Sequence, residues 1–191
     1  MPPTFASGPP PSSSRAAPFS SSSLVVRPAK PSDIPTLLRF IADLAKYEEA
    51  PESNHSTVEL LQENIFDKGF AGALIAEIKE GGVGAEANAV GMAIYCHTFS
   101  TWTAKPSLFL EDLYVSPQAR NRGAGKALFR ELGAIAEREG CPRLDWNVLE
   151  WNEPSIAFYT KVLGAHKMNE WRTCRLEGEG ITRLRSLGLD S

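Results

Sequence analysis

One stretch, residues 108–129 with the sequence LFLEDLYVSPQARNRGAGKALF, most constrains how this chain can fold. Residues 108–115 are mainly apolar and aromatic and end at a Ser-Pro pair, which is typical of a buried strand. Residues 126–139 place apolar side chains at helical spacing. The stretch therefore predicts a strand, a glycine-containing turn and a helix, in that order.

The turn, Arg-Asn-Arg-Gly-Ala-Gly, has the composition of a phosphate-binding loop. A helix start offers N–H groups and partial positive charge, and Gly123 and Gly125 allow a ligand to approach the backbone closely. A dinucleotide fingerprint would need glycine in place of Leu128. A P-loop would need glycine in place of Arg120 and a hydroxyl side chain in place of Ala127. The pattern R-x-x-G-x-G remains, and a tight turn that needs glycine for packing alone is the alternative.

This turn, with its strand and helix, resembles the acyl-CoA pyrophosphate loop, [QR]-x-x-G-x-[GA], of the GNAT superfamily of N-acetyltransferases. The resemblance implies acetyl-CoA as co-substrate. The loop residues that would bind it are Arg120, Asn121, Arg122, Gly123, Ala124, Gly125 and Lys126. The resemblance also implies that the pantetheine arm pairs with backbone groups of Leu113, Tyr114 and Val115, as a peptide would. Such pairing requires that the strands at 108–115 and 143–150 splay apart.

A second stretch, W-N-E-P-S-I-A-F-Y at residues 151–159, narrows the resemblance to one branch of the superfamily. With the Leu-Gly-Ala that follows, it looks like the diamine acetyltransferases, which act on spermidine or spermine, thialysine and ornithine. Segments 44–48, 110–112 and 170–172 resemble the same branch. A small-molecule amine substrate and a homodimer are thereby implied. A protein or peptide N-acetyltransferase and a non-catalytic acyl-CoA-binding module are the alternatives.

Acetyl transfer to an amine requires a base for the ammonium and an acid for the departing thiolate. The resemblance assigns the first role to Glu111, through water, and the second to Tyr159. The alternatives are a strand carboxylate in an ion pair and an aromatic ring that packs the helix. We expect direct attack by the amine, because no histidine or acid is placed by sequence to activate Cys96 as a nucleophile.

Further residues are candidates for ligand contacts. Asn152 and Ser155 are expected to touch the pantetheine or adenine side of the cofactor, with helix capping as the alternative. For the amine, carboxylates could pair with an ammonium and indoles could hold a cation; these candidates are Trp102, Asp112, Glu170 and Trp171.

One departure from the branch bears on the substrate. Polyamine-specific members carry an acid just before the tryptophan of this loop, where the chain has Ser100-Thr101 before Trp102. The departure favours a shorter amine that carries its own carboxylate, such as thialysine, ornithine or lysine.

The whole pattern predicts an α+β fold of α/β type. The expected sheet is mixed and mostly antiparallel, has a splayed parallel pair and is flanked by helices, as in the GNAT fold. Strands are expected at 24–27, 71–79, 89–99, 108–115, 143–150 and 170–176, and helices from Ser32, at 56–66, at 126–139 and at 153–162. Residues 1–23 are Pro- and Ser-rich and are expected to be a disordered tail, and residues 24–191 one N-acetyltransferase domain.

Composition excludes several other classes of protein. A net charge of −3 gives no reason to expect nucleic acid as a partner. Three scattered cysteines are typical of reduced thiols in a cytoplasmic protein, although the Ser-rich tail leaves a targeting peptide as an alternative. The histidines and cysteines lack metal-site spacing, so no metal is expected, and no apolar run reaches the length of a membrane span.

Overall fold

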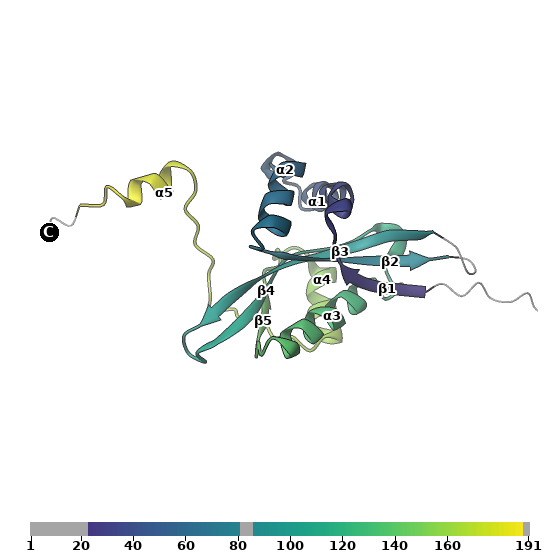
Figure 1. The fold of residues 1–191 in the computed structure, drawn as a ribbon. Coiled ribbons are helices and arrows are strands. Elements are labelled where there is room, and N and C mark those ends of the chain that lie inside the picture. The colour runs from purple at the N-terminus through teal and green to yellow at the C-terminus, as the bar shows by residue number, and fades with distance from the viewer. Residues whose placement is uncertain (1–22, 81–85, 189–191) are drawn as a thin grey trace, which may run out of the picture. The chain divides into compact units, whose positions relative to one another are not determined.

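The computed structural model describes residues 23–80 and 86–188, which divide into two compact units, one ending at Asn147 and one beginning at Val148. The predicted tail lies outside the described residues except for Ser23, the first residue of β1. The first unit contains one sheet in the order β1-β2-β3-β4-β5 (Figure 1). Its strands are β1 (Ser23–Pro28), β2 (Gly72–Lys79), β3 (Ala87–Ser100), β4 (Lys105–Val115) and β5 (Leu144–Trp146).

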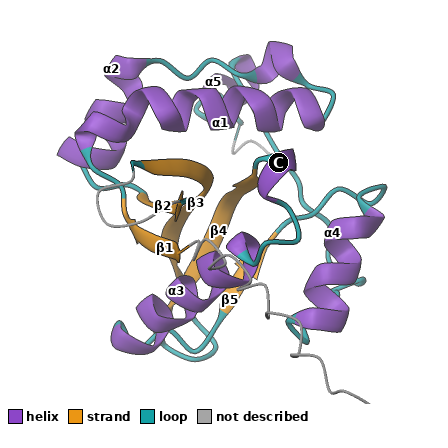
Figure 2. Cartoon of the chain, turned by 90° about the vertical axis from the view of Figure 1, so that its right-hand side faces the viewer, coloured by secondary structure: helices purple, strands orange, loops and turns teal. Residues whose placement is uncertain are grey.

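The first four strands pair antiparallel, and β4 and β5 pair parallel. Helices α1 (Ile34–Tyr47) and α2 (Val58–Leu61) cover one face of the sheet. Helix α3 (Ala124–Arg138) covers the other face (Figure 2). The predicted mixed sheet flanked by helices is therefore confirmed.

The core under α1 is built from the apolar stripe that the helical spacing predicts. Leu37 and Phe40 of α1 are fully buried against Met92 of β3. The ring of Tyr114 on β4 joins this cluster, with its centroid 5.1 Å from that of Phe40. On the opposite face, α3 buries Leu128, Leu132 and Ile135.

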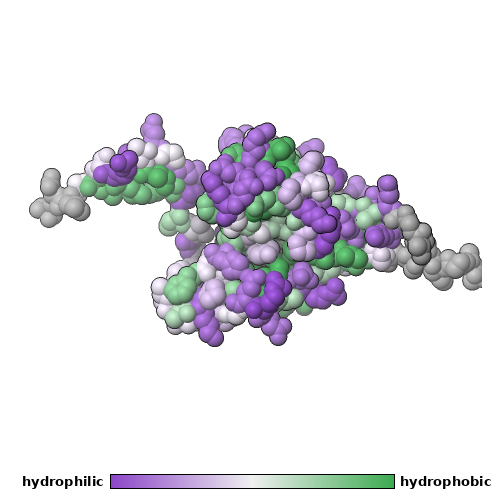
Figure 3. Space-filling model, viewed as in Figure 1, coloured by the Kyte–Doolittle hydropathy of each residue, from purple (hydrophilic) through white to green (hydrophobic). Residues whose placement is uncertain are grey.

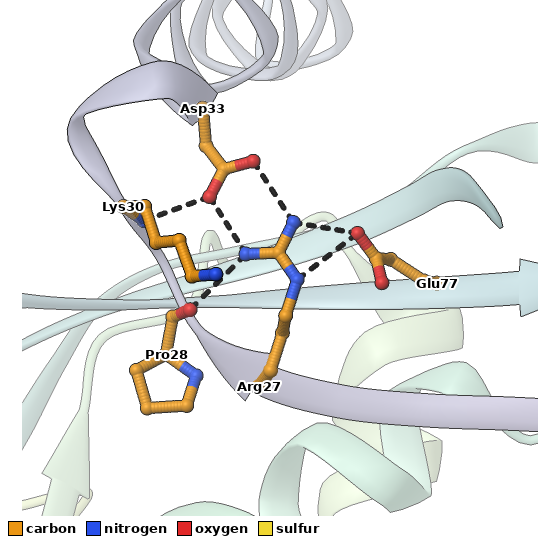
Figure 4. A network of polar contacts seen from close by, with 5 residues as sticks. All are labelled: Arg27, Pro28, Lys30, Asp33 and Glu77. Carbon is orange, nitrogen blue, oxygen red and sulfur yellow. Dashed lines mark hydrogen bonds and ion pairs between the residues drawn. The ribbon is translucent and has the colours of Figure 1, made fainter.

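A network around Arg27 ties the start of α1 to the sheet (Figure 4). The Arg27 guanidinium donates to both carboxylate oxygens of Asp33, at 2.7 and 2.9 Å, and to Glu77 at 2.6 Å. These contacts lower the pKa of Asp33 and raise that of Arg27 above its usual range. The helix predicted from Ser32 begins as an α-helix only at Ile34, because Pro31–Asp33 form a 3-10 turn in which the Asp33 carboxylate accepts the Lys30 N–H at 2.7 Å.

The second helix also begins differently from the prediction. Its cap is Thr57, whose Oγ1 accepts the Leu60 N–H at 3.2 Å, so the helix begins at Val58 and not at the predicted residue 56. The helix continues as a π-helical segment, Gln62–Asp67.

The second unit begins with α4 (Glu153–Ala157), continued by the π-helical segment Phe158–Val162, and ends with α5 (Glu179–Leu184). The predicted strand at 170–176 is wrong, because these residues form a turn and an irregular segment. A strand needs a hydrogen-bonded neighbour, and no strand occurs among residues 148–188. Helix α5 shows an apolar surface (Figure 3), to which Ile181 and Leu184 contribute, 53% and 48% exposed.

Among residues 23–80 and 86–188, no helix is both long enough and apolar enough to span a membrane.

Candidate functional site

The most informative local feature of the first unit is a bulge in β4. Ile94 pairs with Asp112 and Tyr95 with Leu110, so Glu111 lies opposite no residue of β3. A bulge bends its strand and redirects side chains. Glu111 is exposed as a result, whereas Asp112 is only partly exposed.

The parallel pairing with β5 stops at the same place. The ladder runs from Leu108 opposite Leu144 to Leu110 opposite Trp146 and goes no further. From Glu111 to Val115, β3 is the only described strand that pairs with β4. The β4–β5 ladder therefore leaves the end of β4 unpaired on this side by described strands, and β5 is only three residues long, shorter than the strand predicted at 143–150.

Leu113, Tyr114 and Val115, the residues expected to pair with pantetheine, lie in this part of β4. The Tyr114 side chain is buried under α1, and its hydroxyl donates to Asp43 Oδ2 at 3.2 Å. The Tyr114 side chain is therefore part of the core, and only its backbone groups are candidates for contact with a ligand.

The turn between β4 and α3 has the geometry that an anion-binding loop requires. Asn121 and Gly123 have positive φ angles of 61° and 90°, and Gly123 directly precedes the helix. A side chain at Gly123 would find space, its nearest neighbour being Leu24 at 3.8 Å, so the backbone conformation is what favours glycine. The N–H groups of Ala124, Gly125 and Lys126 occupy the first turn of α3, where no intrahelical acceptor exists.

The two arginines of this loop have different partners. Arg120 donates from Nε to the Val115 carbonyl at 3.3 Å, and its guanidinium carbon lies 5.2 Å from the centroid of the Tyr47 ring. Arg122 donates to Glu80 at 2.6 Å. Both side chains contact protein groups, so the backbone amides and the exposed Lys126 are the more direct candidates for phosphate.

An acidic group surrounds the bulge on the side of α1. Burial, followed by the negative charges of Glu111 and Glu48, raises the pKa of Asp112 from 3.8 to about 6. Burial also raises the pKa of Glu48, the residue that follows α1. Sequence reasoning named Glu111 and Asp112 but gave Glu48 no role. Glu48 could have been found from the sequence as an acid that directly follows the last residue of an amphipathic helix.

Cys96 lies on β3 near this group. Burial and the charge of Glu111 raise the pKa of its thiol, which keeps the sulfur protonated and weakly nucleophilic.

Within the first unit, Trp102 lies far from the acidic group. It lies in the turn between β3 and β4 and is 88% exposed. Asp112 lies seven residue steps along β4 from Lys105, which corresponds to about 23 Å. Ser100 is buried there, and its Oγ accepts the Thr103 N–H at 3.4 Å.

The second unit carries the remaining candidates. Asn152 caps α4, because its Oδ1 accepts the Ser155 N–H at 3.3 Å, which is the capping alternative considered from the sequence. Tyr159 lies in the π-helical segment after α4, a type of irregularity that often marks functional sites. Its ring centroid is 5.6 Å from that of Phe158. Glu170 and Trp171 are exposed.

Known proteins resemble this chain over the region that contains these elements. A model of the acetyltransferase (GNAT) family matches residues 38–165. A thialysine N-epsilon-acetyltransferase from Sus scrofa is 34% identical over 167 residues, covering 85% of this chain and 97% of that protein. An L-ornithine N5-acetyltransferase from Arabidopsis thaliana is 30% identical over 99 residues, covering 52% of this chain and 43% of that protein.

Solved structures share the fold. An integron cassette protein from the mobile metagenome of V. cholerae superposes with a TM-score of 0.67 at 24% identity, covering 85% of this chain and 98% of that one. A Trypanosoma brucei acetyltransferase gives a TM-score of 0.59 at 24% identity, covering 81% and 99%. With its bulged strand, glycine turn and α3 inside the matched region, the chain belongs to the GNAT family of N-acetyltransferases.

Proposed function

We propose that this N-acetyltransferase transfers the acetyl group of acetyl-CoA to the side-chain amine of a small diamine-like substrate. The observation that carries the proposal is the acidic group at the β4 bulge, Glu111, Asp112 and Glu48. It lies on and beside the same strand that leads into the glycine turn. A cationic amine and an anionic cofactor would thus be bound at successive positions along one strand.

Two features of the chain support acetyl-CoA as the co-substrate. The edge of β4 from Glu111 to Val115 offers backbone groups to a peptide-like arm. The positive φ at Gly123 and the first amides of α3 suit a pyrophosphate. The thioester supplies an activated acetyl group.

In the proposed mechanism, Asp112 pairs with the incoming ammonium and Glu111 removes a proton from it through water. The neutral amine then attacks the acetyl carbonyl directly, the C–S bond of the thioester breaks, and the nitrogen releases its second proton to water as the amide forms. Tyr159 donates a proton to the departing thiolate, because a protonated thiol is the better leaving group. No acyl-enzyme forms, which agrees with the raised pKa of the Cys96 thiol.

The preferred substrate in this proposal is a basic amino acid or thialysine rather than a long polyamine. A polyamine carries several positive charges and no anion, so it needs a run of acids. The acidic group at the bulge consists of Glu111, Asp112 and Glu48, and the turn of Trp102, about 23 Å away along β4, adds no acid at Ser100 or Thr101. The similarity to the thialysine enzyme over most of both chains supports the shorter amine. The same proposal includes a cytoplasmic homodimer, to be checked by light scattering and by fractionation.

The experiment compares turnover of thialysine, ornithine, lysine and spermidine with that of short peptides, using acetyl-CoA. Free diamines should be acetylated with higher kcat/KM than peptide N-termini. Acetylation of peptides only would favour the protein-acetylating alternative, and cofactor binding without turnover would favour a non-catalytic module.

Tyr159→Phe tests the acid in the same assay. Because a general acid typically contributes about 100- to 10,000-fold, kcat should fall strongly while acetyl-CoA affinity and melting temperature stay nearly unchanged. Near-normal turnover would assign Tyr159 to packing alone.

A further inference from the structure

The side chain of Arg120 connects two elements that the proposed function uses separately. Its Nε donates to the carbonyl of Val115, the last residue of β4, at 3.3 Å. Its guanidinium carbon lies 5.2 Å from the centroid of the Tyr47 ring, within the distance of a cation–π contact. Its own N–H donates to Pro117 at 3.3 Å, which fixes the start of the turn.

Arg122, two residues further along, makes no such connection. Its guanidinium pairs with Glu80, just after β2, at 2.6 Å. The loop therefore contains two arginines of equal charge. In the described part of the chain, Arg120 contacts α1 and Arg122 does not. This difference provides a matched control.

Tyr47 is the last residue of α1, and the acidic group begins at the next residue, Glu48. After burial and the charge of Glu111, the Glu48 charge also raises the pKa of Asp112, so the end of α1 contributes to the electrostatics of the bulge. A second contact, from Tyr114 to Asp43 at 3.2 Å, holds the preceding turn of α1 to β4. The position of Glu48 thus depends on how firmly the end of α1 is held from two sides, by Tyr114 and by Arg120.

We infer that Arg120 is a positioning residue that couples occupancy of the cofactor loop to the shape of the acidic amine site. A ligand that immobilises the turn also immobilises Arg120, and through its contact with Tyr47 it orders Glu48 against Asp112. The amine then binds a site that is already ordered, so it loses less conformational freedom on binding. This inference rests on the proposed function and adds to it that the cofactor promotes amine binding.

The test measures binding by calorimetry in the full chain, with coenzyme A and thialysine as probes, each alone and each in the presence of the other. In the wild type, saturating coenzyme A should raise thialysine affinity at least fivefold, and thialysine should raise coenzyme A affinity by the same factor. Arg120→Met should reduce this factor to near one, with melting temperature within a few degrees of the wild type. In steady-state assays its KM for the amine should rise more than its kcat falls.

Two further variants separate positioning from a general loss of charge. Arg122→Met removes an equal charge from the same loop and should weaken coenzyme A binding while keeping the coupling factor. Tyr47→Leu should lose the coupling as Arg120→Met does, and the double variant should lose no more than either one, since both act through one contact.

Each outcome tests either the positioning role of Arg120 or the proposed function. A wild type without coupling, or an Arg120→Met protein that retains it, overturns the positioning role. Equal loss of coupling in Arg120→Met and Arg122→Met shows that loop charge alone is responsible, which also overturns it. A wild type that binds no coenzyme A refutes the proposed function instead.

Discussion

Asp112→Asn is expected to stabilise the folded protein at neutral pH and to impair its activity. Asp112 lies at the β4 bulge, where burial, followed by the charges of Glu111 and Glu48, raises its pKa from 3.8 to about 6. An ionised carboxylate is therefore less favourable at this site than in the unfolded chain. Asparagine has nearly the same shape and cannot ionise.

The magnitude follows from the two pKa values. The difference between 3.8 and about 6, at about 1.4 kcal/mol per pKa unit, corresponds to about 3 kcal/mol as an upper limit. The folded state binds the proton more tightly, so the unfolding free energy of the wild type falls as pH rises from about 4 to about 7. Asp112→Asn lacks this dependence, and the stability difference should grow from near zero at pH 4 to about 3 kcal/mol above pH 7.

Urea unfolding at several pH values between 4 and 8 measures this difference directly. For a chain of this length, about 3 kcal/mol would raise the melting temperature by about 6–12 °C. Glu137→Gln, an isosteric change at an exposed position of α3, is the control and should change stability by less than about 0.5 kcal/mol.

Activity should move in the opposite direction. Because Asp112→Asn removes the carboxylate proposed to pair with the ammonium, its KM for the amine should rise. A stability difference that does not vary with pH, or a variant less stable than wild type at pH 8, would refute the reasoning. Either result would mean that the ionised Asp112 is compensated in the folded protein.

Three other changes test the loop, the sheet and the substrate preference. Gly125→Asp adds charge and bulk at the first turn of α3 and should weaken acetyl-CoA binding at least tenfold, or about 1.4 kcal/mol, by calorimetry of the folded variant. Gly91→Ala should destabilise by about 1–3 kcal/mol, because its Cβ would lie 2.7 Å from a backbone oxygen of β4, whereas Gly133→Ala in open space on α3 should not. Ser100→Asp, or Thr101→Asp at an exposed position, should move the kcat/KM ratio of the two competing amines from thialysine toward spermidine; an unchanged ratio would exclude this turn from specificity.

Local pattern was sufficient to predict the strand, turn and helix at the centre of the fold. The apolar run of β4, the glycines of the turn and the helical spacing of α3 each express a preference of nearby residues, and the structure agrees with all three. The apolar stripe of α1 and the order of the first five strands were predictable for the same reason.

Features that depend on a partner element were not predictable. The bulge at Glu111 exists only in the register between β3 and β4, and β5 shortens to three residues because its pairing ends there. The segment 170–176 has strand-like composition but no strand among residues 148–188 to pair with.

The chemistry of the candidate site divides in the same way. The sequence by itself determined which acids stand on β4 and which glycines lie at the start of α3. Only the tertiary structure decided that Asp112 is partly buried within reach of the Glu48 charge and that Arg120 lies against Tyr47. Burial and charge proximity arise from residues distant in the chain, and they depend on packing that no local pattern contains.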